Sequence, residues 1–112
     1  MNKDDFLVGI FEFREEIPDL LVSSCFLAER VKKPKKFENY GQEVMDIVKK
    51  PVNLRNIDQK RLEQLYWSYS NLYVKIAEEL AYLCEVAENS VPRVILSPRL
   101  ARWWNNYKYN GV

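Results

Sequence analysis

The sequence predicts an all-α protein, a small helical bundle that forms a single domain over residues 1–112. Three observations predict this class. The chain has only three glycines, its five prolines separate segments whose apolar residues recur at helical spacing, and no run shows the alternation of a strand. A chain of this length buries roughly two-thirds of the surface that its unfolded form exposes, so folding requires neither a disulfide nor a metal ion.

The first helix is expected to begin after Asn2, because Asp4 and Asp5 follow it and acidic side chains favour a helix N-terminus. Pro18 is expected either to kink this helix or to open the next one, since proline at the first helical position loses no hydrogen bond. The helical pattern then continues to Arg30 and ends in a basic turn around Pro34. One face of the first segment carries Phe6, Ile10, Phe13 and Ile17.

A short helix is expected from about Phe37 to Lys49, with Pro51 as its stop. The clearest element is one long helix over about 57–88, which Asn56 and Gln59 would open as a capping box. Its apolar residues recur at intervals of three and four: Leu62, Leu65, Tyr69, Leu72, Ile76, Leu80, Leu83 and Ala87.

A second row lies on another side of the long helix and consists of Trp67, Val74 and Ala81 at intervals of seven. A helix that is apolar on more than one side is buried, either by its own chain or by a partner. About 30 residues rise about 45 Å, which is longer than a compact domain of this size is wide. Either the long helix projects or another segment or molecule covers it.

The chain changes character after Asn89, which is expected to end the long helix in the left-handed conformation. Residues 91–96 are expected to be extended, and Ser97 followed by Pro98 is typical of a helix start. Residues 90–112 therefore form a basic, aromatic C-terminal tail or a short terminal helix. Leu100, Trp104 and Tyr107 would share one face of that helix, with Trp103 off the face.

Several classes of function are excluded by residue types that the sequence lacks. There is no histidine, which removes serine and cysteine nucleophiles activated by histidine, histidine-ligated zinc and haem, and carboxylate–histidine di-iron sites. Three glycines cannot form a phosphate-binding loop. Cys25 and Cys84 are too far apart for a Cys-x-x-Cys motif and are interpreted as buried, inert thiols.

Carboxylates are the remaining candidates for catalysis, and they are interpreted as solvated side chains. Glu78 and Glu79 diverge by about 100° on a helix, and Glu12 and Glu16 form an acidic strip beside the apolar face. We therefore expect no enzyme activity, no catalytic residue, no metal ion, no cofactor and no small-molecule substrate.

A cytoplasmic location is expected. The start of the chain, Met1 to Asp5, lacks the basic and then apolar run of a signal peptide. The longest nearly apolar stretch, Leu20 to Ala28, is less than half of the roughly 20 residues that cross a bilayer, so no membrane span is expected.

Charge is segregated along the chain although the formal net charge is only +1. Residues 1–29 carry two basic and seven acidic side chains, residues 30–61 ten and four, residues 62–88 one and five, and residues 89–112 four and none. Acidic helices thus alternate with basic segments. Either these charges neutralise one another within the molecule, or the basic segments form one exposed patch for a phosphate backbone or an acidic partner.

The leading hypothesis is a non-enzymatic helical interaction protein that binds another protein, itself, or both. Tryptophan, tyrosine and arginine dominate protein–protein hot spots, although the same residues also occur in cores, at nucleic-acid surfaces and at membrane interfaces. The residues expected to contact a partner are Trp67, Val74, Arg99, Arg102, Trp103, Trp104 and Tyr107. The chain's size, its lysine and asparagine content and its aromatic helices resemble small proteins carried by phages and other mobile elements, which favours a viral regulator or inhibitor.

The alternative hypothesis is a nucleic-acid-binding accessory protein that uses the basic segments together with the tail aromatics. Its affinity would fall steeply with added salt, because binding of cations to phosphates releases counterions. The basic residues expected to bind nucleic acid are Lys32, Lys33, Lys35, Lys36, Lys49, Lys50, Arg55, Lys60 and Arg61.

Overall fold

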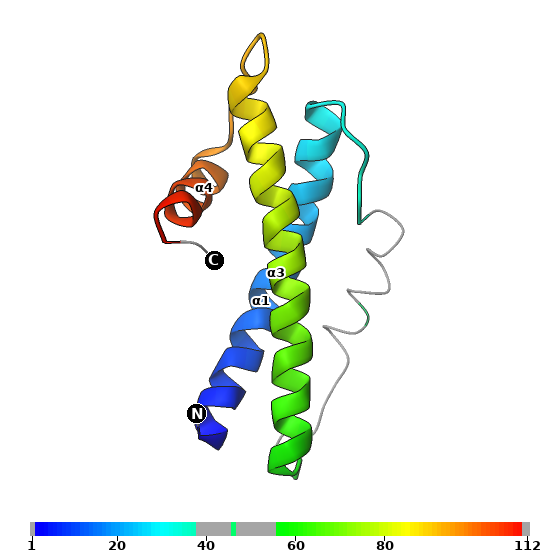
Figure 1. The fold of residues 1–112 in the computed structure, drawn as a ribbon, viewed down its shortest axis with the longest axis vertical. Helices are drawn as coiled ribbons and strands as arrows, with labels where there is room; N and C mark the ends of the chain where they lie inside the picture. The colour runs from blue at the N-terminus through cyan, green and yellow to red at the C-terminus, as the bar shows by residue number, and fades with distance from the viewer. Residues whose placement is uncertain (1, 38–45, 47–55, 111–112) are drawn as a thin grey trace.

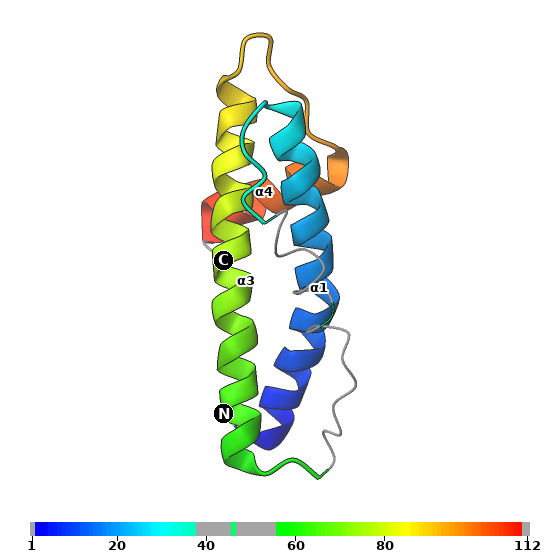
Figure 2. The ribbon, with the colours of Figure 1, turned by 90° about the vertical axis from the view of Figure 1, so that its right-hand side faces the viewer.

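A computed structural model describes residues 2–37, 46 and 56–110, and it confirms the all-α class. The described helices are α1 (Lys3–Arg30), α3 (Gln59–Asn89) and α4 (Pro98–Asn110), and the described residues contain no strand. α1 and α3 lie side by side and run in the same direction (Figures 1 and 2). α4 lies across this pair, with its start beside α1 and its end beside α3 (Figure 2). The molecule is elongated, 53 × 30 × 18 Å.

The predicted start of α1 is confirmed. The Asn2 side chain accepts a hydrogen bond from the Asp5 backbone N–H at 2.9 Å, and the Asp5 carboxylate accepts one from the Asn2 backbone N–H at 3.2 Å. This reciprocal capping box satisfies two backbone donors that the first helical turn would otherwise leave without partners.

Pro18 does not open a second helix; α1 continues through it from Lys3 to Arg30. A proline inside a helix lacks one backbone hydrogen bond and costs about 3 kcal/mol. Burial on both sides of the proline offsets this cost, because Ile10, Ile17 and Leu21 are almost completely removed from solvent against α3. Tertiary packing therefore overrides the local preference for a break.

α1 ends in the basic turn that the sequence predicts. The Lys33 N–H donates to the Ala28 carbonyl at 2.9 Å and the Lys32 N–H to the Glu29 carbonyl at 3.3 Å, which is the hydrogen-bond pattern of a Schellman motif. Lys32 occupies the left-handed position of this motif, with φ at 58°. Glycine is the usual residue there, since a side chain in this conformation costs about 1 kcal/mol.

Both predicted end signals of the long helix are wrong in detail. The N-cap is Asp58, whose carboxylate accepts from the Arg61 N–H at 2.8 Å, and not Asn56. At the other end Asn89 is still helical, and the C-cap is Ser90 in an extended conformation. The Ser90 hydroxyl donates to the Val86 carbonyl at 2.7 Å, which satisfies an end carbonyl without a left-handed residue.

The core lies between α1 and α3. The regular row of the long helix faces α1, and the largest side chains with almost no exposure are Ile10, Ile17, Leu62, Ile76, Leu80, Leu83 and Cys84. α1 therefore covers the long helix from within the chain. Cys84 is buried as predicted, and this burial raises the pKa of its thiol to about 12. The same prediction is wrong for Cys25, which is only half-buried.

Aromatic rings join α1 and α3 along one side of this core. The Tyr66 ring packs against Phe6 at 5.2 Å and against Phe13 at 5.5 Å between centroids, and Phe13 also contacts Tyr73 at 5.4 Å. Gly9 allows this approach, since a Cβ atom at residue 9 would lie 2.5 Å from Cε2 of Tyr66. The glycine therefore marks a close helix–helix contact.

The predicted short helix from Phe37 to Lys49 lies mostly outside the described residues. Phe37 itself is buried in the core cluster. The connection from α3 to α4 is irregular, and it is held by the Val94 N–H on the Ala87 carbonyl at 3.1 Å and by the Arg30 guanidinium on the Ile95 carbonyl at 3.1 Å. α4 then begins with Ser97 as its cap, as predicted: its hydroxyl accepts from the Leu100 N–H at 3.3 Å.

Candidate functional site

The largest exposed apolar side chains on α1 lie along one line of the helix. Val8, Phe11, Val22 and Phe26 are 55–64% exposed. At 100° per residue they lie within about 60° of one another and opposite the buried Ile10 and Ile17. We call this line, together with Glu12, Glu15 and Asp19 between its two apolar pairs, the outer face of α1. It is about 27 Å long, since 18 residues separate Val8 from Phe26.

The sequence interpretation missed this face. It predicts only the face of Phe6, Ile10, Phe13 and Ile17 on the first segment, and it leaves open whether Pro18 kinks that helix or opens another. A helical wheel drawn through the proline separates these residues from the core face. The signal is present in the sequence, but it becomes clear only when residues 3–30 are treated as one helix through Pro18.

The centre of the outer face is acidic. Among the described residues, neither Glu12 nor Glu15 makes an ion pair or hydrogen bond through its side chain. Asp19 is paired with Arg99 of α4 at 2.7 Å, and both side chains are largely exposed. An exposed pair of this kind contributes below about 1 kcal/mol. The outer face therefore offers apolar ends and a negative centre.

α4 forms a cleft with α1 at the edge of the outer face. We call it the α1–α4 cleft, and its volume is about 350 Å³. Val22 belongs to both the cleft and the outer face. The polar and aromatic residues of its walls are Glu16, Asp19, Ser23, Tyr73, Ser97, Arg99 and Trp103.

Tyr73 connects the three helices at the floor of this cleft. Burial raises the pKa of Tyr73, and the neighbouring charge and hydrogen bond of Glu16 raise it further, while a hydrogen bond with Trp103 lowers it. The hydroxyl therefore stays protonated at neutral pH and remains bonded to Glu16. Glu16 of α1, Tyr73 of α3 and Trp103 of α4 thus line the same cleft.

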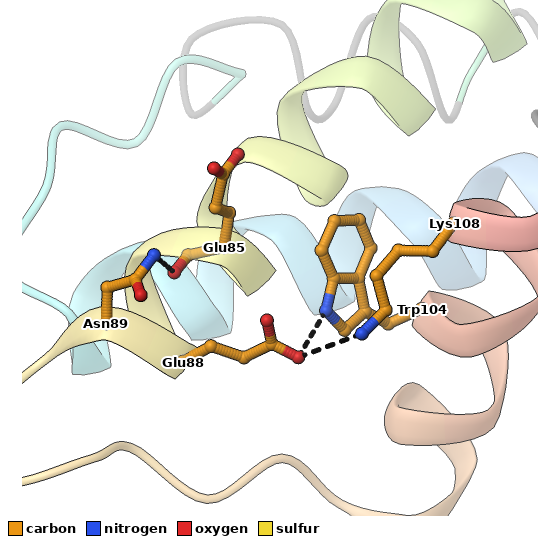
Figure 3. Close-up of polar contacts among 5 residues, drawn as sticks. All are labelled: Glu85, Glu88, Asn89, Trp104 and Lys108. Atoms are coloured by element: carbon orange, nitrogen blue, oxygen red, sulfur yellow. Dashed lines mark hydrogen bonds and ion pairs between the residues drawn. The ribbon is translucent and has the colours of Figure 1, made fainter.

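α4 is anchored to α3 by the Glu88 carboxylate (Figure 3). One carboxylate oxygen, Oε1, accepts from the Trp104 indole Nε1 at 2.8 Å and from Lys108 Nζ at 3.2 Å. Lys108 also lies over the Trp104 ring at 5.1 Å from its centroid. Trp104 is 7% exposed and is the buried residue of α4.

The Glu88 anchor predicts that α4 docking weakens in acid. The hydrogen bond from Trp104 and then that from Lys108 lower the pKa of Glu88 below its ordinary value of 4.5. A depressed pKa contributes stability that is present above the unfolded value and is lost as pH falls through the folded value. We expect Glu88→Gln to lower the free energy of unfolding by about 1 kcal/mol at pH 6 and by less at pH 3, measured by urea denaturation. An equal effect at both pH values would contradict the role of the charge.

The predicted partner residues divide into three groups in the structure. Trp104 is buried and is therefore a packing residue, and Tyr107 and Trp103 are half-buried and stacked on each other at 5.2 Å. Arg99 lies in the α1–α4 cleft and Arg102 is exposed. In the second row of α3, Trp67 is 54% exposed, Val74 is half-buried and Ala81 is buried, so the row is not a continuous exposed stripe.

The described basic residues do not come together in one patch. Lys32, Lys33, Lys35 and Lys36 follow the end of α1, whereas Lys60 and Arg61 belong to the first turn of α3, at the opposite end of the molecule (Figures 1 and 2). Two of the lysines are paired with acids, Lys35 with Glu29 and Lys36 with Glu79, each at 3.6 Å. Lys49, Lys50 and Arg55 lie outside the described residues.

In the described part of the chain, the cysteine and acidic side chains do not gather in any group of three that could hold a metal ion. None of its helices has a stretch apolar enough, over enough residues, to cross a membrane.

Comparison of the chain with protein-family models, with curated proteins and with solved structures found no match. Its function is therefore inferred from its own residues.

Proposed function

We propose that this protein is a non-enzymatic binding protein and that the outer face of α1 docks a helix of a second protein, whose activity it regulates or inhibits. The observation that carries the proposal is the single file of Val8, Phe11, Val22 and Phe26, all more than half exposed. Burial of apolar area is favourable by about 25 cal/mol per Å², so covering two exposed phenylalanines on one face would stabilise a complex.

The spacing of these residues suits a helix as the partner. Intervals of three between Val8 and Phe11 and of four between Val22 and Phe26 are those of a helix–helix seam. A partner helix of about 18 residues would cover the whole file, and it would turn the pair of α1 and α3 into a three-helix arrangement. Interactions of this type depend on a few large apolar anchors, here Phe11 and Phe26.

The charge of the face favours a basic partner over a second copy of this chain. An antiparallel second copy would bring Val8 opposite Phe26, but it would also enclose Glu12 and Glu15 of both copies, which have no ion pair among the described residues. A parallel copy would bring Glu15 opposite Glu15. Like charges in an interface cost several kcal/mol. A partner helix with apolar residues near both ends and lysine or arginine in its central turns complements the face throughout.

Site-specific crosslinking in the cells that produce the protein tests this proposal. A photoreactive phenylalanine analogue is placed at Phe11, at Phe26, or at Tyr82 as a control. Tyr82 is also an exposed aromatic residue, 47% exposed, but it lies on α3. We expect Phe11 and Phe26 to give adducts with the same second protein, mapped by mass spectrometry to one basic helix, and Tyr82 to give none. Glu12→Arg together with Glu15→Arg should reduce both adducts.

Three outcomes would overturn the proposal. Adducts of the chain with itself would make the outer face a dimer interface, and adducts with nucleic acid would support the alternative hypothesis. No adduct at Phe11 or Phe26, with the helical content of the labelled protein unchanged by circular dichroism, would show that the face has no partner.

A further inference from the structure

We infer that the α1–α4 cleft is a binding site for an arginine side chain. The walls combine the two features that bind a guanidinium group: carboxylates, from Glu16 and Asp19, and aromatic rings, from Tyr73 and Trp103. The cleft volume of about 350 Å³ is at the lower end of the range for small-ligand sites. An arginine side chain fits within this volume.

The structure already contains one guanidinium group at the mouth of this cleft. Arg99 donates from Nη2 to the Asp19 carboxylate at 2.7 Å, while its side chain remains 84% exposed. Asp19 is thus neutralised by the protein's own arginine, and Glu16 remains as the second carboxylate of the walls. The unbalanced charge of the carboxylates and Arg99 together is one negative charge, which a single cation matches.

Tyr73 lies beside the carboxylate that an incoming arginine would meet. The charge and the hydrogen bond of Glu16 are among the causes that raise the pKa of Tyr73, and Glu16 itself stays exposed to solvent. A guanidinium group is planar and can bind a carboxylate at its edge while it stacks on a ring with its face, which an ammonium group cannot do. The combination of Glu16 and Trp103 therefore favours arginine over lysine.

The source of this arginine follows from the position of the cleft, and this step depends on the proposed function. Val22 lies both in the cleft and on the outer face, so a helix docked on that face passes the cleft mouth. One arginine from the basic central turns of the partner helix would enter the α1–α4 cleft. The cleft would then select partners by one side chain, while Phe11 and Phe26 supply the apolar contact.

The cleft can be tested without any partner by titration with N-acetyl-arginine amide, followed by NMR of the Trp103 indole N–H. The matched neutral probe is N-acetyl-citrulline amide, which has nearly the same shape. We expect the arginine probe to shift this resonance with a Kd of about 1–10 mM and the citrulline probe to bind at least about fivefold more weakly. N-acetyl-lysine amide should also bind more weakly.

Two variants assign the effect to the cleft. Glu16→Gln should weaken arginine binding about fivefold, whereas Glu12→Gln, which removes an exposed acid on the same helix, should change it less than about twofold. Equal binding of arginine and citrulline, equal effects of the two variants, or no shift of the Trp103 resonance would each overturn the inference. These results are independent of the crosslinks at Phe11 and Phe26. The titration can therefore overturn the arginine site while the crosslinks still support docking on the outer face.

Discussion

Replacing Trp104 with alanine is expected to detach α4 from α1 and α3 and to lower the free energy of unfolding by about 3 kcal/mol. The indole is 7% exposed and is the one buried side chain of α4. Its removal also leaves Glu88 without the N–H that lies 2.8 Å from its carboxylate. The loss of packing and the loss of a charge-assisted hydrogen bond therefore act together.

Urea denaturation gives the change in free energy, and limited proteolysis between residues 98 and 110 reports the docking of α4. Trp104→Phe should lower the free energy of unfolding by less, about 1–2 kcal/mol, because this variant keeps a buried ring and lacks only the N–H donor. Arg102→Ala, at an exposed neighbour, is the control and should change neither measurement. A Trp104→Ala protein with an unchanged midpoint and a protease-resistant α4 would refute the anchor.

Gly9→Ala is expected to destabilise the protein by about 1–3 kcal/mol, although the same change at an exposed helical site stabilises by about 1 kcal/mol. The added Cβ would lie 2.5 Å from Cε2 of Tyr66. The Tyr66 ring cannot simply rotate away, because it is packed against Phe6 at 5.2 Å and Phe13 at 5.5 Å. α1 and α3 must therefore separate locally, and the measurement is again the free energy of unfolding in urea.

A double-mutant cycle identifies the cause of this effect. In a Tyr66→Ala protein the ring is gone, so adding Gly9→Ala should be neutral or stabilising. If Gly9→Ala destabilises equally in both backgrounds, the cost comes from somewhere other than the contact with Tyr66.

The regular parts of this fold could be predicted from the sequence because they depend on local chemistry. The three-and-four spacing from Leu62 to Ala87 predicts the buried row of α3, Asn2 and Asp5 supply a cap within one turn, and Ser97 with Pro98 opens α4. These signals involve residues that interact with their own neighbours in the chain, so no knowledge of the tertiary structure is needed.

The remaining features depend on contacts between distant residues. Pro18 remains inside α1 because Ile17 and Leu21 are buried against α3, which no local rule predicts. The helix spacing correctly grouped Leu100, Trp104 and Tyr107, yet it could not decide whether this face meets the chain itself or a partner. The α1–α4 cleft could not be predicted for the same reason: Glu16, Tyr73 and Trp103 are far apart in the sequence.

Pro18 also interrupts the hydrogen-bond ladder of α1, and we expect the two halves of the helix to differ in local unfolding. The hydrogen bond that an ordinary residue would donate at position 18 is missing, so cooperativity along the helix is interrupted there. Before the proline, Phe6, Gly9 and Phe13 pack beside Tyr66; after it, Asp19 is paired with α4. We expect the first half to open with its aromatic contacts more readily than the second half, which is paired with α4. A partner that spans both ends of the outer face would then couple the two halves.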